Sequence, residues 1–151
     1  MIILDNSVLS AFTRLKLLPQ LKEWISSAII TKDVLVEYTR YWQNTVPNWI
    51  KIEEHDEKIK ISNPSASLSI ADLSLIKLSL DLNMPIASDD NPLRQFAKKL
   101  GIKVTDTLGL LKALYQNNII ATSDKYMASL EELQKDLYLS KELIEWALKG
   151  L

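Results

Sequence analysis

Acidic residues stand at two places where an α/β protein could use them for chemistry. Asp5 directly follows the apolar run Ile2–Leu4, and Asp89 and Asp90 directly follow a second short run at 85–88. A short continuous apolar run indicates a strand that is buried on both faces. Because open α/β sheets bind ligands at the carboxyl ends of their strands, these three carboxylates are candidates for one site.

Two further acids are predicted on helices that border the same edge of the sheet. Glu37 lies one turn into a helix that Asp33 would cap, and Asp72 lies in the first turn of a helix capped by Ser67 or Ser69. Carboxylates gathered in one cleft raise each other's pKa values, and a bound divalent cation relieves that repulsion. Oxygen ligands favour Mg²⁺ or Mn²⁺, which can activate a water and hold the oxygens of a phosphodiester.

Each of these acids also has an ordinary structural interpretation. Carboxylates near helix N-termini commonly cap the helix or face solvent. The pair Asp89–Asp90 before Asn91–Pro92 could serve a turn, and His55 is interpreted as a solvated loop residue. The tryptophans are interpreted as core or interface residues rather than as a surface for stacking bases: Trp24, Trp42, Trp49 and Trp146.

Composition restricts the class of protein. The chain has 151 residues, 47% hydrophobic and 25% charged, which is typical of one domain with a substantial core. A net charge of −1 does not indicate a polyanionic partner, although a local basic stripe or a metal ion can attract one. The lack of cysteine and the single histidine exclude disulfides, thiolate metal sites and histidine-rich metal sites. With no apolar run of membrane-spanning length and no apparent signal peptide, we expect a cytoplasmic location.

Strand and helix patterns alternate through residue 117. Strands are predicted at 2–4, 28–31, 49–53, 85–88 and 102–105, with one further turn of strand at Ile59–Ile61. Helices are predicted at 7–18, 19–25, 33–42, 69–82, 92–100, 106–117, 123–137 and 140–148. This alternation predicts an α/β fold, a three-layer α/β/α sandwich with a parallel sheet and right-handed crossovers. We expect a single domain over 1–151, with an α/β core at 1–120 and a helical tail at 121–151.

Local details follow from the same patterns. Expected N-caps are Asn6 or Ser7 for the first helix, Asp33 for the third and Asn91 for the fifth, with Pro92 in its first turn. The core should contain Ile3, Ile30, Ile86 and Val104. In the helix at 92–100, the residues expected to point inward are Leu93, Phe96, Ala97 and Leu100, and those expected to point outward are Arg94, Lys98 and Lys99.

The acidic motifs resemble those of the PIN domain, a family of Mg²⁺- or Mn²⁺-dependent ribonucleases. The matching segments are Ile2–Ser7, Val34–Tyr38, Ala71–Ile76 and Ile86–Asp90. The chain is more specifically similar to a subgroup of small prokaryotic PIN-like proteins described as predicted nucleic-acid-binding. That similarity lies in Asp89–Gly101, Asp106–Leu111 and the two-helix tail Leu130–Leu148.

Three positions depart from the subgroup's pattern. Ser74 stands where the subgroup often has a second acid, and Asn91 replaces a basic residue. Asp106 replaces a glycine and adds a carboxylate. These departures bear on the level of activity more than on the fold.

The resemblance implies a five-stranded parallel sheet of order 3-2-1-4-5 and a metal-dependent endoribonuclease. In this interpretation Asp5, Glu37, Asp72 and either Asp89 or Asp90 hold one or two Mg²⁺ or Mn²⁺ ions, and water rather than a protein nucleophile attacks the phosphodiester. Asn6 or Ser7 would orient substrate or water. RNA phosphates would be contacted, with little sequence selectivity, by Arg14, Arg94, Lys98 or Lys99. The alternative is a PIN-like module that binds nucleic acid or a partner with little catalysis.

The resemblance also bears on partners. Relatives include the toxin halves of toxin–antitoxin pairs, which implies an antitoxin-like protein partner. The tail from Ser123 to Leu151 carries more apolar residues than one narrow stripe on two short helices requires. Since relatives commonly pair, we expect a homodimer with the tail at its interface or reserved for a partner peptide. The alternative is that the tail packs wholly within its own chain.

Overall fold

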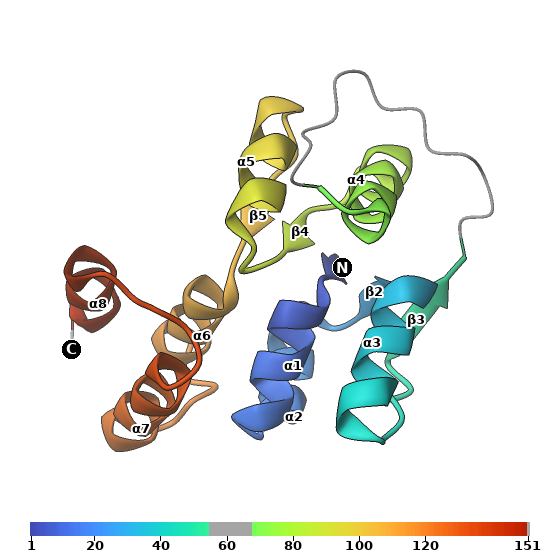
Figure 1. Ribbon diagram of the computed structural model, residues 1–151. Coiled ribbons are helices and arrows are strands. Elements are labelled where there is room, and N and C mark those ends of the chain that lie inside the picture. The colour runs from blue at the N-terminus through green and yellow to red at the C-terminus, as the bar shows by residue number, and fades with distance from the viewer. Residues whose placement is uncertain (55–67, 151) are drawn as a thin grey trace.

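The computed structural model describes residues 1–54 and 68–150, so His55 and the expected strand turn at Ile59–Ile61 lie outside the described residues. Within these ranges five parallel strands form one sheet of order β3-β2-β1-β4-β5 (Figure 1). The strands are β1 (Ile2–Leu4), β2 (Ala28–Thr31), β3 (Ile50–Glu53), β4 (Ile86–Ala87) and β5 (Val104–Thr105). The predicted α/β fold and strand order are confirmed.

Helices connect the strands and extend beyond the last one. They are α1 (Asn6–Arg14), α2 (Leu18–Ile25), α3 (Lys32–Trp42), α4 (Ile70–Leu82), α5 (Asn91–Lys99), α6 (Thr107–Gln116), α7 (Ser123–Gln134) and α8 (Lys141–Leu148). Helices α1 and α3 lie side by side, joined by a hydrogen bond of 2.9 Å between the Thr13 and Tyr38 hydroxyls (Figure 1). Among the described residues, no helix combines the length and apolar character needed to cross a membrane.

The position of β1 in the sheet explains why its sequence is an unbroken apolar run. Strand β1 lies between β2 and β4, and all three of its residues are buried. Ile3, Ile30 and Ile86 are completely buried, as predicted. Val104 is only partly buried, because β5 is an edge strand and lacks a neighbour on one side. Val104 therefore packs against the core from its edge instead of lying within it.

The N-caps of three helices lie one or two residues earlier than predicted. Asp5 directly follows β1, Thr31 is the last residue of β2, and Asp90 is the third residue after β4. Each of these side chains accepts a backbone N–H from the first turn of its helix, which fixes where the helix begins. The observed N-caps are Asp5, Thr31 and Asp90, in place of Asn6 or Ser7, Asp33 and Asn91. The consequence is that two of the candidate site acids, Asp5 and Asp90, also hold helix N-termini.

The tail packs partly on its own chain. The Tyr126 ring stacks on Tyr115 of α6 with centroids 4.5 Å apart, and its hydroxyl donates to the Ala147 carbonyl at 2.8 Å. Trp146 is nevertheless 44% exposed and Tyr138 is 88% exposed. Apolar surface therefore remains on α7 and α8 after they have packed, and the expected homodimer stays a prediction.

Candidate active site

A cavity of about 300 Å³ opens at the carboxyl end of β1, where the sequence predicts the site. Its walls come from the start of α1, the first turns of α3 and α4, and the start of α5. The residues that line it are Asp5, Asn6, Ser7, Val34, Glu37, Ser69, Ala71, Asp72, Leu75 and Asp90. The fold thus brings four of the five predicted acids to one cavity from four different elements.

The Asp5 carboxylate accepts hydrogen bonds from three residues, Asn6, Ser7 and Ser88. Its Oδ1 accepts the Asn6 backbone N–H at 2.8 Å, and its Oδ2 accepts the Ser88 hydroxyl at 2.6 Å. Burial raises the pKa of the Asp5 carboxyl from 3.8 to about 6, and the nearby Asp72 charge adds to the rise, while the hydrogen bonds from Ser88, Asn6 and Ser7 oppose it. The hydrogen bonds therefore stabilise the ionised form of Asp5 by less than burial destabilises it.

Two serines tie Asp5 to the turn between β4 and α5. The Ser88 hydroxyl donates to Asp5 Oδ2 and accepts the Asp90 backbone N–H at 3.0 Å. The Ser7 hydroxyl donates to the same oxygen at 3.3 Å and accepts the Asp89 backbone N–H at 3.0 Å. Ser7 lines the cavity, but its hydroxyl is therefore engaged within the protein. Ser88 was not predicted as a site residue, although a polar residue ending a buried strand just before an acid pair is a usable signal.

The adjacent acids Asp89 and Asp90 have different roles. Asp89 Oδ1 accepts the Thr107 backbone N–H at 2.8 Å, and its Oδ2 accepts the Thr107 hydroxyl at 2.7 Å. Burial raises the pKa of Asp89, and its hydrogen bonds to Thr107 oppose that rise. Asp89 thus anchors the start of α6 and does not line the cavity. Asp90 lines the cavity while its Oδ2 accepts the Leu93 N–H at 3.0 Å. Of the two acids, Asp90 is therefore the one that lines the cavity, and which of them would bind a metal ion stays a prediction.

The other two cavity acids are held less tightly. Asp72 forms a capping box with Ser69, in which Asp72 Oδ2 accepts the Ser69 N–H at 3.0 Å and Ser69 Oγ accepts the Asp72 N–H at 3.1 Å. Glu37 is exposed on α3. Ser74, where the subgroup often has a second acid, is buried and donates to the Ile70 carbonyl at 3.0 Å. Ser74 is not part of the cavity wall.

The oxygen atoms that line the cavity are of the kind that a hard divalent cation prefers, but the carboxylates are spaced more widely than in a closed metal site. Among residues 1–54 and 68–150, no three His, Asp or Glu side chains lie close enough together to hold a metal ion. All donors in the cavity are oxygens, and the raised pKa of Asp5 marks charge that a cation would stabilise. Mg²⁺ usually binds through one or two carboxylates and keeps several waters, so an open arrangement suits it.

The predicted phosphate-binding residues are distributed unevenly. Arg94 does not point outward as expected: it is half-buried and pairs with Asp106 at 3.2 Å across the α5–α6 junction. Lys98 is exposed in the last turn of α5, about 12 Å along the helix from Asp90. Leu100, expected to point inward, is 38% exposed just beyond that helix. Arg14 pairs with Asp136 at 2.9 Å and lines a second groove that adjoins the acidic cavity.

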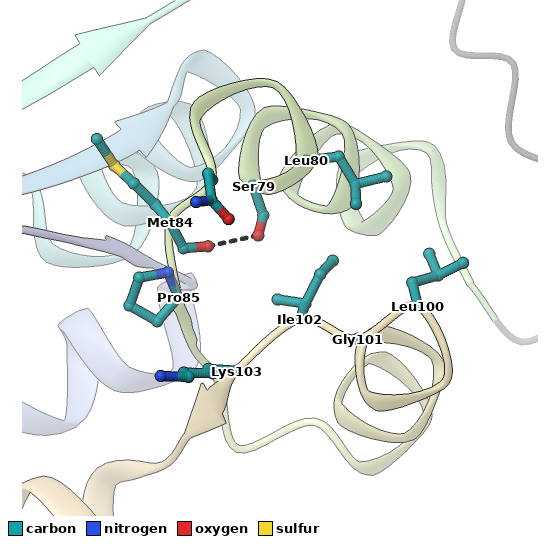
Figure 2. A pocket seen from close by; sticks show the side chains of 9 residues that line it. Ser79, Leu80, Met84, Pro85, Leu100, Gly101, Ile102 and Lys103 are labelled. Atoms are coloured by element: carbon teal, nitrogen blue, oxygen red, sulfur yellow. Dashed lines mark hydrogen bonds between the residues drawn. The ribbon is translucent and has the colours of Figure 1, made fainter.

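A separate cavity of about 500 Å³ lies at the opposite end of β4, between α4 and α5. Figure 2 shows Leu80 projecting from α4, Leu100 at the end of α5, and Ile102 and Lys103 on the segment that leads to β5. Of the described residues that line it, Lys103 is the only charged one, and none is a carboxylate. Among the described residues, this cavity therefore lacks the carboxylates that line the one at the carboxyl ends of the strands.

Comparison with known proteins agrees with this fold. A family model described as PIN domain matches residues 1–151. A solved structure of a PilT N-terminus domain protein from the hyperthermophilic archaeon Sulfolobus solfataricus P2 is similar with a TM-score of 0.56 and 19% sequence identity, covering 75% of this chain and 92% of that one. None of the curated proteins matches the chain significantly.

A parallel sheet of order 3-2-1-4-5 with acids at the carboxyl ends of its strands defines a PIN-like α/β protein. The match along the whole chain makes the assignment specific: the chain belongs to the PIN domain family, whose members are generally nucleases.

Proposed function

We propose that this protein is a metal-dependent ribonuclease that hydrolyses RNA phosphodiesters at the acidic cavity. The observation that carries the proposal is the convergence of Asp5, Glu37, Asp72 and Asp90 on one cavity around a buried carboxylate. These residues would hold Mg²⁺ or Mn²⁺, with water completing the coordination. A bound ion of this kind supplies Lewis-acid stabilisation of phosphoryl oxygens and lowers the pKa of a water.

The chain's own contribution is to hold these groups in place. With a pKa of about 6, Asp5 is mostly ionised at neutral pH, and the Ser88 and Ser7 hydroxyls fix the direction of its Oδ2. Asn6 Oδ1 accepts the Ser10 hydroxyl at 3.0 Å, which leaves the Asn6 amide N–H groups to donate to substrate or water. Val34 of α3 and Leu75 of α4 contribute apolar side chains to the cavity wall.

Cleavage of a generic single-stranded RNA with Mn²⁺ tests this function. Wild type should cleave, and Asp5→Asn should lose nearly all activity because the neutral amide cannot balance a cation. Asp124→Asn, a change at an exposed position in the first turn of α7, is the matched control and should cleave like wild type. Calorimetric titration with Mn²⁺ should show binding to wild type that weakens in Asp5→Asn. Cleavage that is equal in wild type and Asp5→Asn would place the chemistry elsewhere.

A second function is favoured by one specific observation. The described carboxylates line the cavity without gathering closely enough to enclose an ion. A module that binds nucleic acid or a partner protein with little catalysis would show this arrangement. Retained RNA binding by a wild-type protein that does not cleave in Mn²⁺ would support this function over the first.

A further inference from the structure

A groove of about 620 Å³ between α1 and α3 adjoins the acidic cavity. Its lining residues are Asn6, Ser10, Arg14, Glu37, Arg40 and Tyr41. Asn6 and Glu37 line both the groove and the cavity, so the two concavities share a boundary. An extended ligand that leaves the cavity between these helices therefore enters the groove.

The spacing of the lining residues explains why the groove is continuous. Residues 6, 10 and 14 follow one another at intervals of four on α1, and residues 37, 40 and 41 share one face of α3. The two faces meet because α1 and α3 pack side by side (Figure 1). From Asn6 to Arg14 the α1 stripe extends about 12 Å. It leads from the carboxylates to a pair of arginines.

Tyr41 gives this groove an exposed aromatic ring on a fixed support. The Tyr41 side chain is 71% exposed, and its ring meets the Trp42 ring edge-on, with centroids 5.1 Å apart and planes at 74°. The Trp42 Nε1–H donates to the Ser10 hydroxyl at 3.0 Å, which ties Trp42 to α1. A single exposed aromatic is ordinary, but this one stands in a polar groove beside cations.

The cations at the far end of the groove suit phosphate. Arg40 is exposed, and within the described residues it has no salt bridge to a carboxylate. Arg14 pairs with Asp136, and both side chains remain partly exposed. Guanidinium groups bind phosphate through two parallel hydrogen bonds. The groove therefore combines a stacking surface with phosphate donors, next to the carboxylates.

We propose that the α1–α3 groove binds single-stranded RNA, with an unpaired base stacked on Tyr41 and a phosphate held by Arg40. The inference rests on the proposed function in one respect: the RNA strand is taken to run from the groove into the acidic cavity, where cleavage is proposed. It narrows the substrate class to RNA whose bases are free to stack. Base–aromatic stacking tolerates any sequence, because every base presents a flat face.

Binding measured without metal separates this inference from catalysis. The probe is a fluorescently labelled uridine oligomer, titrated with full-length protein in EDTA and followed by anisotropy. Tyr41→Ala should weaken binding at least about fivefold, the lower end for the loss of one stacked base, whereas Tyr41→Phe should stay within about twofold. Arg40→Ala should weaken binding and reduce the slope of log K against log salt by about 0.7. Trp24→Ala and Lys22→Ala, on the exposed surface of α2, are the matched controls and should bind like wild type.

Each outcome decides one of the two claims. If wild type cleaves RNA but Tyr41→Ala binds RNA as tightly as wild type, the proposal of RNA binding in the groove would be overturned. The proposal of ribonuclease activity would still be supported. If binding depends on Tyr41 but wild type does not cleave RNA, the proposal of RNA binding in the groove would be supported and the proposal of ribonuclease activity would be rejected. Equal loss of affinity in Tyr41→Ala and Tyr41→Phe would also overturn stacking. If Tyr41→Ala weakened binding of a duplex RNA as much as it weakens binding of the single strand, the assignment to unpaired bases would be contradicted.

Discussion

The buried Asp5 carboxyl makes a prediction about stability that does not require activity. Its pKa rises from 3.8 to about 6 on folding, so between these pH values the folded protein binds more protons than the unfolded chain. Stability attributable to Asp5 is therefore highest below pH 4 and falls as the pH rises through 6. At 1.4 kcal/mol per pKa unit, the ionised carboxylate costs about 3 kcal/mol of folding free energy at neutral pH in the metal-free protein.

Replacing Asp5 with Asn removes this cost, because the amide does not ionise. The Asn side chain can still accept the Asn6 N–H as an N-cap. In EDTA, Asp5→Asn should therefore be more stable than wild type by about 1–3 kcal/mol at neutral pH, allowing for a weaker bond to Ser88, and should lose that advantage near pH 4. Urea unfolding at a series of pH values in EDTA measures the difference.

The comparison of the two curves isolates Asp5 from other titrating groups. Asp89 also has a raised pKa, so the wild-type curve alone reflects more than one carboxyl. Asp124→Asn should give a curve parallel to wild type, which controls for the charge change. If the Asp5→Asn and wild-type curves are parallel from pH 4 to pH 8, the burial argument for Asp5 is refuted.

Three further results are expected. Ser88→Ala should lower the free energy of unfolding by about 2–3 kcal/mol in urea titrations. The reason is that the variant loses a completely buried hydroxyl that donates to Asp5 and accepts the Asp90 N–H. An unchanged free energy of unfolding would contradict this role. Thr107→Val should cost about 1–3 kcal/mol by removing one of two hydrogen bonds to Asp89, and a variant as stable as wild type would show that α6 does not need this anchor. Light scattering at micromolar concentration should give about twice the 17.2 kDa monomer mass, and Leu143→Glu, at an exposed apolar position on α8, should return the mass to that of the monomer; a wild-type mass of 17.2 kDa would reject the dimer.

Much of this protein follows from local sequence pattern. Unbroken apolar runs predict strands buried on both faces, and their alternation with helices requires parallel pairing, because a crossover helix returns the chain to the same edge. Once the strands are parallel, acids that follow them must meet at one end of the sheet. That reasoning predicted that Asp5, Glu37, Asp72 and Asp90 border one edge of the sheet, and the structure has them in the lining of one cavity. Their role as metal ligands stays a prediction. The strand order came from the resemblance to a family rather than from periodicity.

The tertiary structure alone decided how neighbouring polar residues divide their roles. Successive side chains at a strand end point in different directions, so Asp89 bonds to Thr107 while Asp90 turns to the cavity. The hydrogen bond from Ser88 to Asp5 joins residues 83 positions apart, and no local pattern encodes it. Arg94 has the spacing of a surface residue on its helix, yet it turns to Asp106 because α6 begins beside it. Local composition fixes which groups are polar, whereas their partners depend on which distant segments the fold places within hydrogen-bonding distance.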